Sequence, residues 1–202
     1  MNKIERIRAA IEGKPVDRVP YAFWSHFPEA DRNPELLAQA VVRFVSDYDT
    51  DLVKVMSNGM YAVEDFGCEC DFSEVARGGA AKVTKTHIET PGDGRKIKPR
   101  ALGSPVLARE LRALELILAG LKGKLPVLFT VFSPLTIAEK LSCGKLREHL
   151  DAGYGDAVDN ALAAMAETVK NLSAKAIELG ADGVFFATQT AVRSCFSAAE
   201  AI

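Results

Sequence analysis

Apolar and polar residues follow one another along this chain in blocks rather than residue by residue. Four short apolar segments, each followed by polar or turn residues, lie at 19–27, 51–59, 125–134 and 181–190. They are nearly continuous and rich in β-branched and aromatic residues, which is typical of strands covered on both faces of a parallel sheet. The pattern therefore predicts four buried parallel strands.

Helical periodicity fills most of the sequence between these strands. Segment 33–49 has Pro34 at a first-turn position behind Asn33, and segment 104–123 begins with Ser-Pro and ends in Gly. Further helices are expected over 135–142 and 156–182, and the charged start of the chain predicts a short helix. Alternating strands and helices indicate parallel βα units.

Residues 72–103 interrupt this alternation. Their polar and apolar residues alternate as in a hairpin, and the sequence PGDG supplies a turn. We expect an inserted β-hairpin here, as an excursion within a single domain that covers residues 1–202.

Two closures of the sheet are compatible with repeated βα units. No glycine occurs in SHFPEADRNP after the first predicted strand, which argues against a doubly wound dinucleotide-binding sheet. A (β/α)8 barrel needs eight units and typically ~250 residues, whereas the 202 residues here supply about four. The expected fold class is therefore α/β, either half of a TIM barrel or a small open sheet.

Composition narrows the classes of partner. The chain is 48% hydrophobic and 26% charged with a net charge of −2, which gives no reason to expect nucleic acid or an anionic membrane surface. It has no apolar run of ~18 residues and no signal-peptide core near its start. These features predict a cytoplasmic protein.

The four cysteines are Cys68, Cys70, Cys143 and Cys195. Without an export signal they are expected to be reduced rather than disulfide-bonded. The C-x-C pair at 68 and 70 is a weak zinc signal because a second close pair is missing. The sequence therefore predicts no metal site made by this chain alone.

Candidate site residues follow from the rule that the carboxyl ends of barrel strands line the active site. His26 could hydrogen-bond a ligand or act as an acid or base, or else be an ordinary loop histidine. Asn58 could bind a ligand through its amide, or else form a turn with Gly59. The rule nominates five residues: His26, Ser57, Asn58, Ser133 and Gln189.

Two aromatic residues near the first predicted strand add a second kind of candidate. Trp24 and Phe27 could stack on a flat tetrapyrrole or corrin. Aromatic residues in a first strand belong more often to the core, and we expect the core placement.

The order of these segments resembles the uroporphyrinogen decarboxylase superfamily. The resemblance is carried by RIRAAIEGKPVDRVPYAFW, DLVKVMSNGMYAVEDFG, VLFTVFSPLTIAEKLSCG and ELGADGVFFATQ, and it extends from residue 4 to about residue 190. It implies a single (β/α)8 barrel longer than this chain. The sequence is then similar to the N-terminal half of such a protein, either as a fragment or as a natural truncation.

The resemblance also implies one of two chemistries. The decarboxylases carry an Asp in FSD after strand two, an Arg-rich loop RQAGRYLPEY and a Tyr in PWTLASY. This chain places Asn58, the sequence WSHFPEADR and Lys140 at those positions. A neutral Asn stabilises a protonated pyrrole less well than a carboxylate does, so the resemblance favours the methyltransferase-like branch.

The leading hypothesis is corrinoid-dependent methyl transfer, to a thiol or from a methoxy or methyl compound. The alternatives are uroporphyrinogen III decarboxylase, a carboxy-lyase, and a non-catalytic half-barrel that binds a tetrapyrrole or corrinoid. The resemblance implies cobalamin as cofactor, with zinc only if a missing C-terminal half supplies its ligands. Expected partners are a corrinoid protein or a small molecule, and an open sheet could also pair with a second copy.

Overall fold

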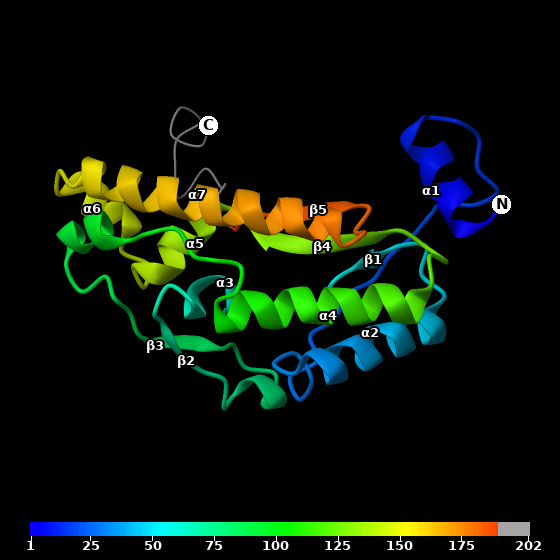
Figure 1. The fold of residues 1–202 in the computed structure, drawn as a ribbon, viewed down its shortest axis with the longest axis horizontal. Helices are drawn as coiled ribbons and strands as arrows, with labels where there is room; N and C mark the ends of the chain where they lie inside the picture. The colour runs from blue at the N-terminus through cyan, green and yellow to red at the C-terminus, as the bar shows by residue number, and fades with distance from the viewer. Residues whose placement is uncertain (190–202) are drawn as a thin grey trace. The chain divides into compact units, whose positions relative to one another are not determined.

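The computed structural model describes residues 1–189 and shows a mixed α/β protein (Figure 1). The chain divides into two compact units. The first comprises 1–58, 108–130 and 173–185, and the second comprises 59–107, 131–172 and the segment that starts at Phe186. The elements are α1 (Lys3–Ile11), α2 (Pro34–Tyr48), β1 (Val53–Lys54), α3 (Tyr61–Glu64), β2 (Glu69–Asp71), η1 (Val75–Arg77), β3 (Lys82–Lys85), η2 (Pro91–Lys96), α4 (Pro105–Leu121), β4 (Val127–Phe132), α5 (Pro134–Leu141), α6 (Leu146–Asp151), α7 (Gly155–Glu178) and β5 (Gly183–Ala187).

The larger sheet of the described residues is parallel. Its strand order is β1-β4-β5, and β1 pairs with β4 in parallel, with Val53 opposite Val127. Asp182 N donates to Val127 O and Ser133 N donates to Ala187 O, both at 2.9 Å. From the first of these hydrogen bonds to the second, the residue numbers increase along both β4 and β5. Strand β5 is therefore also parallel to β4. The predicted parallel βα arrangement is confirmed.

The strand predicted over 19–27 is absent. Residues 19–27 contain no strand, although Tyr21 and Ser25 make hydrogen bonds with residues on either side of β1. Asp51 N donates to Tyr21 O at 2.9 Å, but Ser25 N donates to the sulfur of Met56 at 3.4 Å. Because a thioether sulfur replaces a backbone carbonyl, a regular ladder does not form.

The predicted strands differ in burial. In β4 every residue except Leu128 is buried, as a strand covered on both faces should be. In β5 the residues Val184, Phe185 and Phe186 are 36%, 41% and 54% exposed. The prediction of two covered faces is therefore wrong for β5, which is an edge strand of the described sheet. Thr190, at the end of the predicted strand, and Cys195 lie outside the described residues.

Local capping explains the helices of the first unit. The Asn33 side chain accepts a hydrogen bond from Leu36 N at 2.9 Å, and Pro34 occupies the first turn, as the sequence predicts. Helices α2 and α4 run side by side (Figure 1). Their close approach requires Gly120, because a Cβ there would lie 2.7 Å from Cγ2 of Val42.

A buried ion cluster joins α1 to the start of β1 in the first unit. Asp51 is fully buried and accepts hydrogen bonds from Arg6 Nη1 at 2.7 Å and Arg18 Nη2 at 2.9 Å. Arg6 also donates through Nε to Asp17 at 2.7 Å. We call Arg6, Asp17, Arg18 and Asp51 the base cluster. Burial alone would raise the pKa of Asp51, but bonds from Arg18, Tyr21 N and Arg6 hold it below its usual value.

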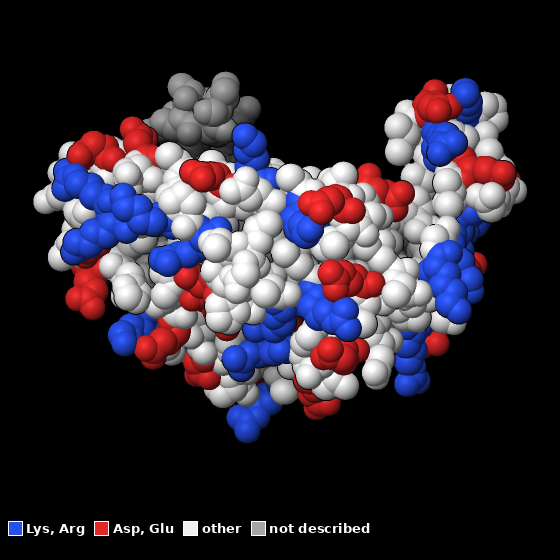
Figure 2. Space-filling model, viewed as in Figure 1, with Lys and Arg blue, Asp and Glu red and all other residues white. Residues whose placement is uncertain are grey.

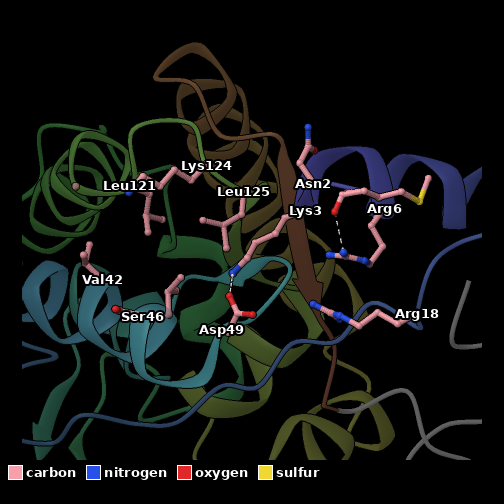
Figure 3. A pocket seen from close by; sticks show the side chains of 13 residues that line it. Asn2, Lys3, Arg6, Arg18, Val42, Ser46, Asp49, Leu121, Lys124 and Leu125 are labelled. Carbon is pink, nitrogen blue, oxygen red and sulfur yellow. Dashed lines mark hydrogen bonds and ion pairs between the residues drawn. The ribbon is translucent and has the colours of Figure 1, made fainter.

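A cavity of about 730 Å³ lies beside the base cluster (Figure 3). Lys3 lines it and pairs with Asp49 at 2.6 Å, and Arg6 lines it while donating to the Met1 carbonyl at 2.8 Å. The charged groups of this cavity are thus largely committed to partners within the chain. Figure 2 shows positive and negative side chains interspersed on the face drawn, in keeping with the net charge of −2.

The inserted hairpin of the second unit lies earlier in the sequence than predicted. Strands β2 and β3 are antiparallel, with Cys70 opposite Val83. The PGDG sequence is not the hairpin turn but the start of η2. Asp93 accepts hydrogen bonds from Thr90 N and Oγ1, and a Cβ at Gly94 would lie 2.5 Å from the Ala157 carbonyl oxygen. Capping and close packing on α7 therefore turn this sequence into a 3₁₀ helix.

Candidate functional site

The carboxyl end of β1 carries two of the predicted site residues. Val55 N donates to Leu128 O at 2.9 Å, which extends the pairing of β1 with β4 toward this end. Asn58 is 5% exposed, and its Nδ2 donates to the carbonyl oxygen of Asp31 at 3.4 Å. The amide is therefore held by the turn that precedes α2 rather than displayed on an open loop.

Ser57 is the second residue at this strand end. It is 5% exposed, and its Oγ has no hydrogen-bond partner within residues 1–189. A buried hydroxyl without a partner costs free energy, so such atoms are uncommon in proteins. The hydroxyl of Ser57 thus keeps hydrogen-bonding capacity that the described residues do not use.

The buried carboxylate near Asn58 was not nominated from the sequence. Asp31 is 3% exposed, and its backbone oxygen is the acceptor for Asn58. Its sequence context, PEADR, gives no sign of burial because acidic residues in such turns are usually exposed. The neighbourhood of Asn58 therefore includes an acidic residue as well as an amide.

The aromatic candidates are placed differently from one another. Trp24 is 55% exposed, so the core placement expected for it is wrong. Its ring meets the ring of His26 edge-on at 5.3 Å, and His26 is also exposed. Phe27 packs edge-on against Phe44 of α2 at 5.9 Å. The structure therefore brings Trp24 and His26 together on the surface and uses Phe27 in packing.

A lysine in β1 is an additional candidate that sequence reasoning missed. The Nζ of Lys54 lies 4.3 Å from the centroid of the Trp24 ring and 4.9 Å from that of the Phe185 ring. Burial lowers the pKa of this ammonium group. The signal that could have found it is a single lysine within the apolar run DLVKVM.

The two site residues predicted in the second unit meet at one hydroxyl. Ser133 accepts from Thr136 N at 3.1 Å and donates to Thr136 Oγ1 at 2.9 Å, which makes it the N-cap of α5. Gln189 N donates to the same Thr136 Oγ1 at 2.9 Å, while the Gln189 side chain is exposed. The hydroxyl of Ser133 is thus committed to capping the helix.

Lys140 is a second half-buried lysine, in the second unit. Its Nζ donates to the Gly59 carbonyl oxygen at 3.3 Å and lies 5.4 Å from the centroid of the Phe132 ring. Burial lowers the pKa of Lys140, and the nearby Cys70 partly opposes this shift. Lys140 therefore places an amine beside the main chain at Gly59, within the second unit.

The described residues do not supply a metal centre. Within 1–189, no group of three or more His, Cys, Asp or Glu side chains is arranged to hold a metal ion. Cys68, Cys70 and Cys143 carry no disulfide. Burial raises the pKa of Cys68 to about 11, which disfavours the thiolate that metals bind.

Comparison with known proteins decides the family. The family model for uroporphyrinogen decarboxylase (URO-D) matches residues 2–197, nearly the full chain. The chain belongs to the uroporphyrinogen decarboxylase family. The resemblance of its sequence segments to that superfamily is confirmed.

Curated relatives of this family member include two methyltransferases. The chain is 25% identical over 199 residues to the methylcobamide:CoM methyltransferase MtaA of Methanosarcina barkeri (strain Fusaro / DSM 804). It is 24% identical over 199 residues to the protein of the same name from Methanosarcina barkeri. Each match covers 92% of this chain and 58% of the relative, so the chain spans little more than half the relatives' length.

A solved structure supports the fold of this family member. A methyltransferase from Methanosarcina mazei matches with a TM-score of 0.74 at 21% identity, over 98% of this chain and 62% of that one. Identity at this level bears on the fold alone. No helix within residues 1–189 is long and apolar enough to cross a membrane.

Proposed function

We propose that this chain forms the first four βα units of a (β/α)8 barrel that catalyses corrinoid-dependent methyl transfer to a thiol. The curated relatives named methylcobamide:CoM methyltransferase support the reaction class. The parallel sheet and the fold match with a methyltransferase support the barrel. The single domain expected over 1–202 is part of this proposal.

The observation that carries the proposal is the neutral amide of Asn58. A decarboxylase of this family needs a carboxylate there to stabilise the protonated pyrrole. Asn58 is buried, and its amide nitrogen already donates to the Asp31 carbonyl. An amide in this position can orient a ligand but cannot supply the missing negative charge.

The exposed edge of the sheet supports an incomplete barrel. Val184 and Phe186 are 36% and 54% exposed, although a strand inside a closed barrel has both faces covered. The relatives extend well beyond the 58% of their length that this chain matches. We propose that further βα units cover β5, supplied by additional chain or by a second copy.

The corrinoid is the cofactor that this proposal requires. When bound, a methylcobamide supplies a methyl group on cobalt that a thiolate can accept. The exposed ring of Trp24 offers a flat apolar surface of the kind that stacks on a macrocycle, and the free Ser57 hydroxyl offers a hydrogen bond. For zinc the residues 1–189 do not fit, since they hold no set of ligands. Any zinc ligands would come from the remaining units.

The test is methyl transfer from methylcobalamin to a small thiol, catalysed by the chain together with the units that complete the barrel. The visible absorbance of the cobalamin reports the loss of its methyl group. The expected result is thiol-dependent demethylation that Asn58→Ala reduces at least tenfold, about 1.4 kcal/mol. Asp47→Asn on the outer surface of α2 is the matched control and should leave the rate unchanged. Demethylation that is equally fast in Asn58→Ala would contradict the role given to this amide.

A second candidate function rests on the buried Asp31. Asp31 belongs to the turn that holds Asn58. Its carboxylate could therefore take the role of the Asp that decarboxylases of this family carry in place of Asn58. Conversion of uroporphyrinogen III to coproporphyrinogen by the chain, abolished in Asp31→Asn, would establish a decarboxylase and overturn methyl transfer. Cobalamin binding without either turnover would support the third alternative, a non-catalytic half-barrel.

A further inference from the structure

The cavity beside the base cluster lies within the first unit, between α1 and the carboxyl-terminal ends of α2 and α4 (Figure 3). Its volume of about 730 Å³ is within the range of ~300–1,000 Å³ that small-molecule sites occupy. None of its lining residues belongs to β5 or lies beyond Leu125. The residues described here therefore form the cavity without the units proposed to cover β5.

One wall of the cavity is apolar. Val42 from α2 and Leu121 from α4 line it, and Leu125 follows from the segment that leads into β4. Gly120 lines it too, and its lack of a side chain lets Val42 pack closely against α4. Hydrocarbon leaves water favourably for such a surface. This wall therefore suits the hydrocarbon part of a ligand.

The other wall is basic. Lys3, Arg6, Arg18 and Lys124 line the cavity, whereas Asp49 is the single carboxylate among its described lining residues. The two arginines pair with the two carboxylates of the base cluster, and Lys3 pairs with Asp49 at 2.6 Å. Four cations thus meet three carboxylates, so one positive charge is left in excess.

Lys124 carries the excess charge. Its side chain is exposed and makes no hydrogen bond or ion pair with another residue of 1–189. Its ammonium group therefore keeps three N–H donors. Arg18 has five N–H groups, of which three donate to Asp51 and to the Val19 carbonyl oxygen. The basic wall thus retains N–H groups that can donate to an anion.

The end of α4 has to be weighed against an anion, because the carboxyl-terminal end of a helix carries partial negative charge. Two of its last carbonyl groups accept hydrogen bonds within the chain: Leu118 O from Lys122 N at 3.0 Å and Leu121 O from Lys124 N at 3.1 Å. The ammonium group of Lys124 adds a full positive charge at the same end. The lysine therefore outweighs the partial charge of the helix end.

We propose that this cavity binds a small amphiphilic anion: a carboxylate or phosphate monoester at the end of an unbranched hydrocarbon chain. The anionic oxygens accept hydrogen bonds from Lys124 on the basic wall, and the chain packs against Val42 and Leu121. Neither Ser57 nor Asn58 lines this cavity. The site is thus separate from the one proposed for methyl transfer.

The experiment uses decanoate and decyl phosphate as probes, with the nitrogen-15-labelled protein in the form used for the methyl-transfer test. Amide chemical shifts are recorded at constant ionic strength set by chloride. The expected result is a saturable shift at Gly120 and Leu125 with one of the probes or both, while Gly183 in β5 does not move. The probe with the lower dissociation constant identifies the anionic group, and hexanoate should bind more weakly than decanoate because its chain is shorter.

Variants separate binding in the cavity from general salt effects. Lys124→Met should weaken decanoate binding at least fivefold because it removes the charge-assisted hydrogen bond. Lys122→Met is the matched control, an exposed lysine two residues away that does not line the cavity, and should bind as the parent does. Ser46→Phe places a ring at the exposed edge of the cavity and should block it. Far-ultraviolet circular dichroism verifies that each variant is folded.

Three results would overturn the proposal. One is the lack of a saturable shift at Gly120 and Leu125 with either probe. Another is decanoate binding that is unchanged in folded Lys124→Met. The third is equally tight binding of decyltrimethylammonium, which has the same chain and the opposite charge. Loss of methyl transfer with intact decanoate binding would count against the proposed function alone, so the two proposals fail separately.

Discussion

Two regions of the first unit surround basic side chains with different neighbours: carboxylates in one region and aromatic rings in the other. In the base cluster, Arg6 and Arg18 meet the carboxylates of Asp17 and Asp51 through hydrogen bonds. On the sheet face, Lys54 meets only aromatic rings within the described residues. The first arrangement pairs its charges with one another, whereas no carboxylate among residues 1–189 pairs with Lys54.

The contrast separates charges that are paired with carboxylates from a charge that meets aromatic rings instead. Removing one member of a buried ion cluster leaves uncompensated charge and is strongly destabilising. Removing a half-buried cation that has no counter-charge among residues 1–189 should relieve a desolvation penalty instead. Opposite effects on stability are therefore expected from substitutions only three residues apart, at positions 51 and 54.

The largest effect is expected from Asp51→Asn. The variant leaves Arg18 without its carboxylate partner and should lower the free energy of unfolding by about 3 kcal/mol at pH 7. Urea unfolding followed by circular dichroism measures it. Asp47→Asn, which removes an exposed pair with Arg43, is the control and should change the value by less than about 0.5 kcal/mol. Equal effects of the two substitutions would show that the base cluster is not a structural centre.

Acid should weaken the base cluster. The Arg6 hydrogen bond lowers the pKa of Asp17, and hydrogen bonds outweigh burial to lower that of Asp51. A carboxylate with a lowered folded pKa stabilises the fold above its unfolded pKa, and this stabilisation is lost as pH falls. The difference in unfolding free energy between the parent chain and Asp51→Asn should therefore shrink below pH about 4. A constant difference down to pH 2 would contradict this assignment.

The smallest effect is expected from Lys54→Met, with the opposite sign. Replacing the half-buried ammonium by an apolar side chain should raise the free energy of unfolding by about 1 kcal/mol at pH 7. Because the folded pKa of Lys54 is lowered, the folded state releases its proton first and the parent chain gains stability as pH rises. The advantage of the variant should thus disappear as pH approaches about 10.4. A destabilised variant would mean that the aromatic contacts outweigh the desolvation penalty.

The sequence predicted those elements whose signals are local. The cap at Asn33 and the first-turn Pro34 act within one helical turn, so α2 could be placed to within a residue or two. The apolar and aromatic residues of segment 19–27 predict a strand that the structure does not contain. In the structure, Ser25 N donates to the side-chain sulfur of Met56 and not to a backbone carbonyl. That acceptor is supplied by tertiary packing and has no counterpart in local composition.

In the candidate site, too, the sequence predicted what depends on local position and missed what depends on tertiary packing. The barrel rule and the family resemblance led to Asn58, and the structure places it buried at the end of β1. Neither could identify Lys54, because its setting depends on Trp24 and Phe185, which are distant in the sequence. Ser133 was nominated by the same rule as Asn58 but caps α5. Position at a strand end therefore selects candidates without distinguishing ligand contacts from caps.

The placement of β5 determines how the sheet can grow. Within residues 1–189, β5 is hydrogen-bonded on one side, to β4. The outward amide and carbonyl groups of an edge strand recur at a fixed spacing and accept another extended chain, not a helix. Main-chain hydrogen bonds would fix the direction and register of an incoming strand. The side chains of Phe185 and Phe186 would then determine which surfaces can pack against β5.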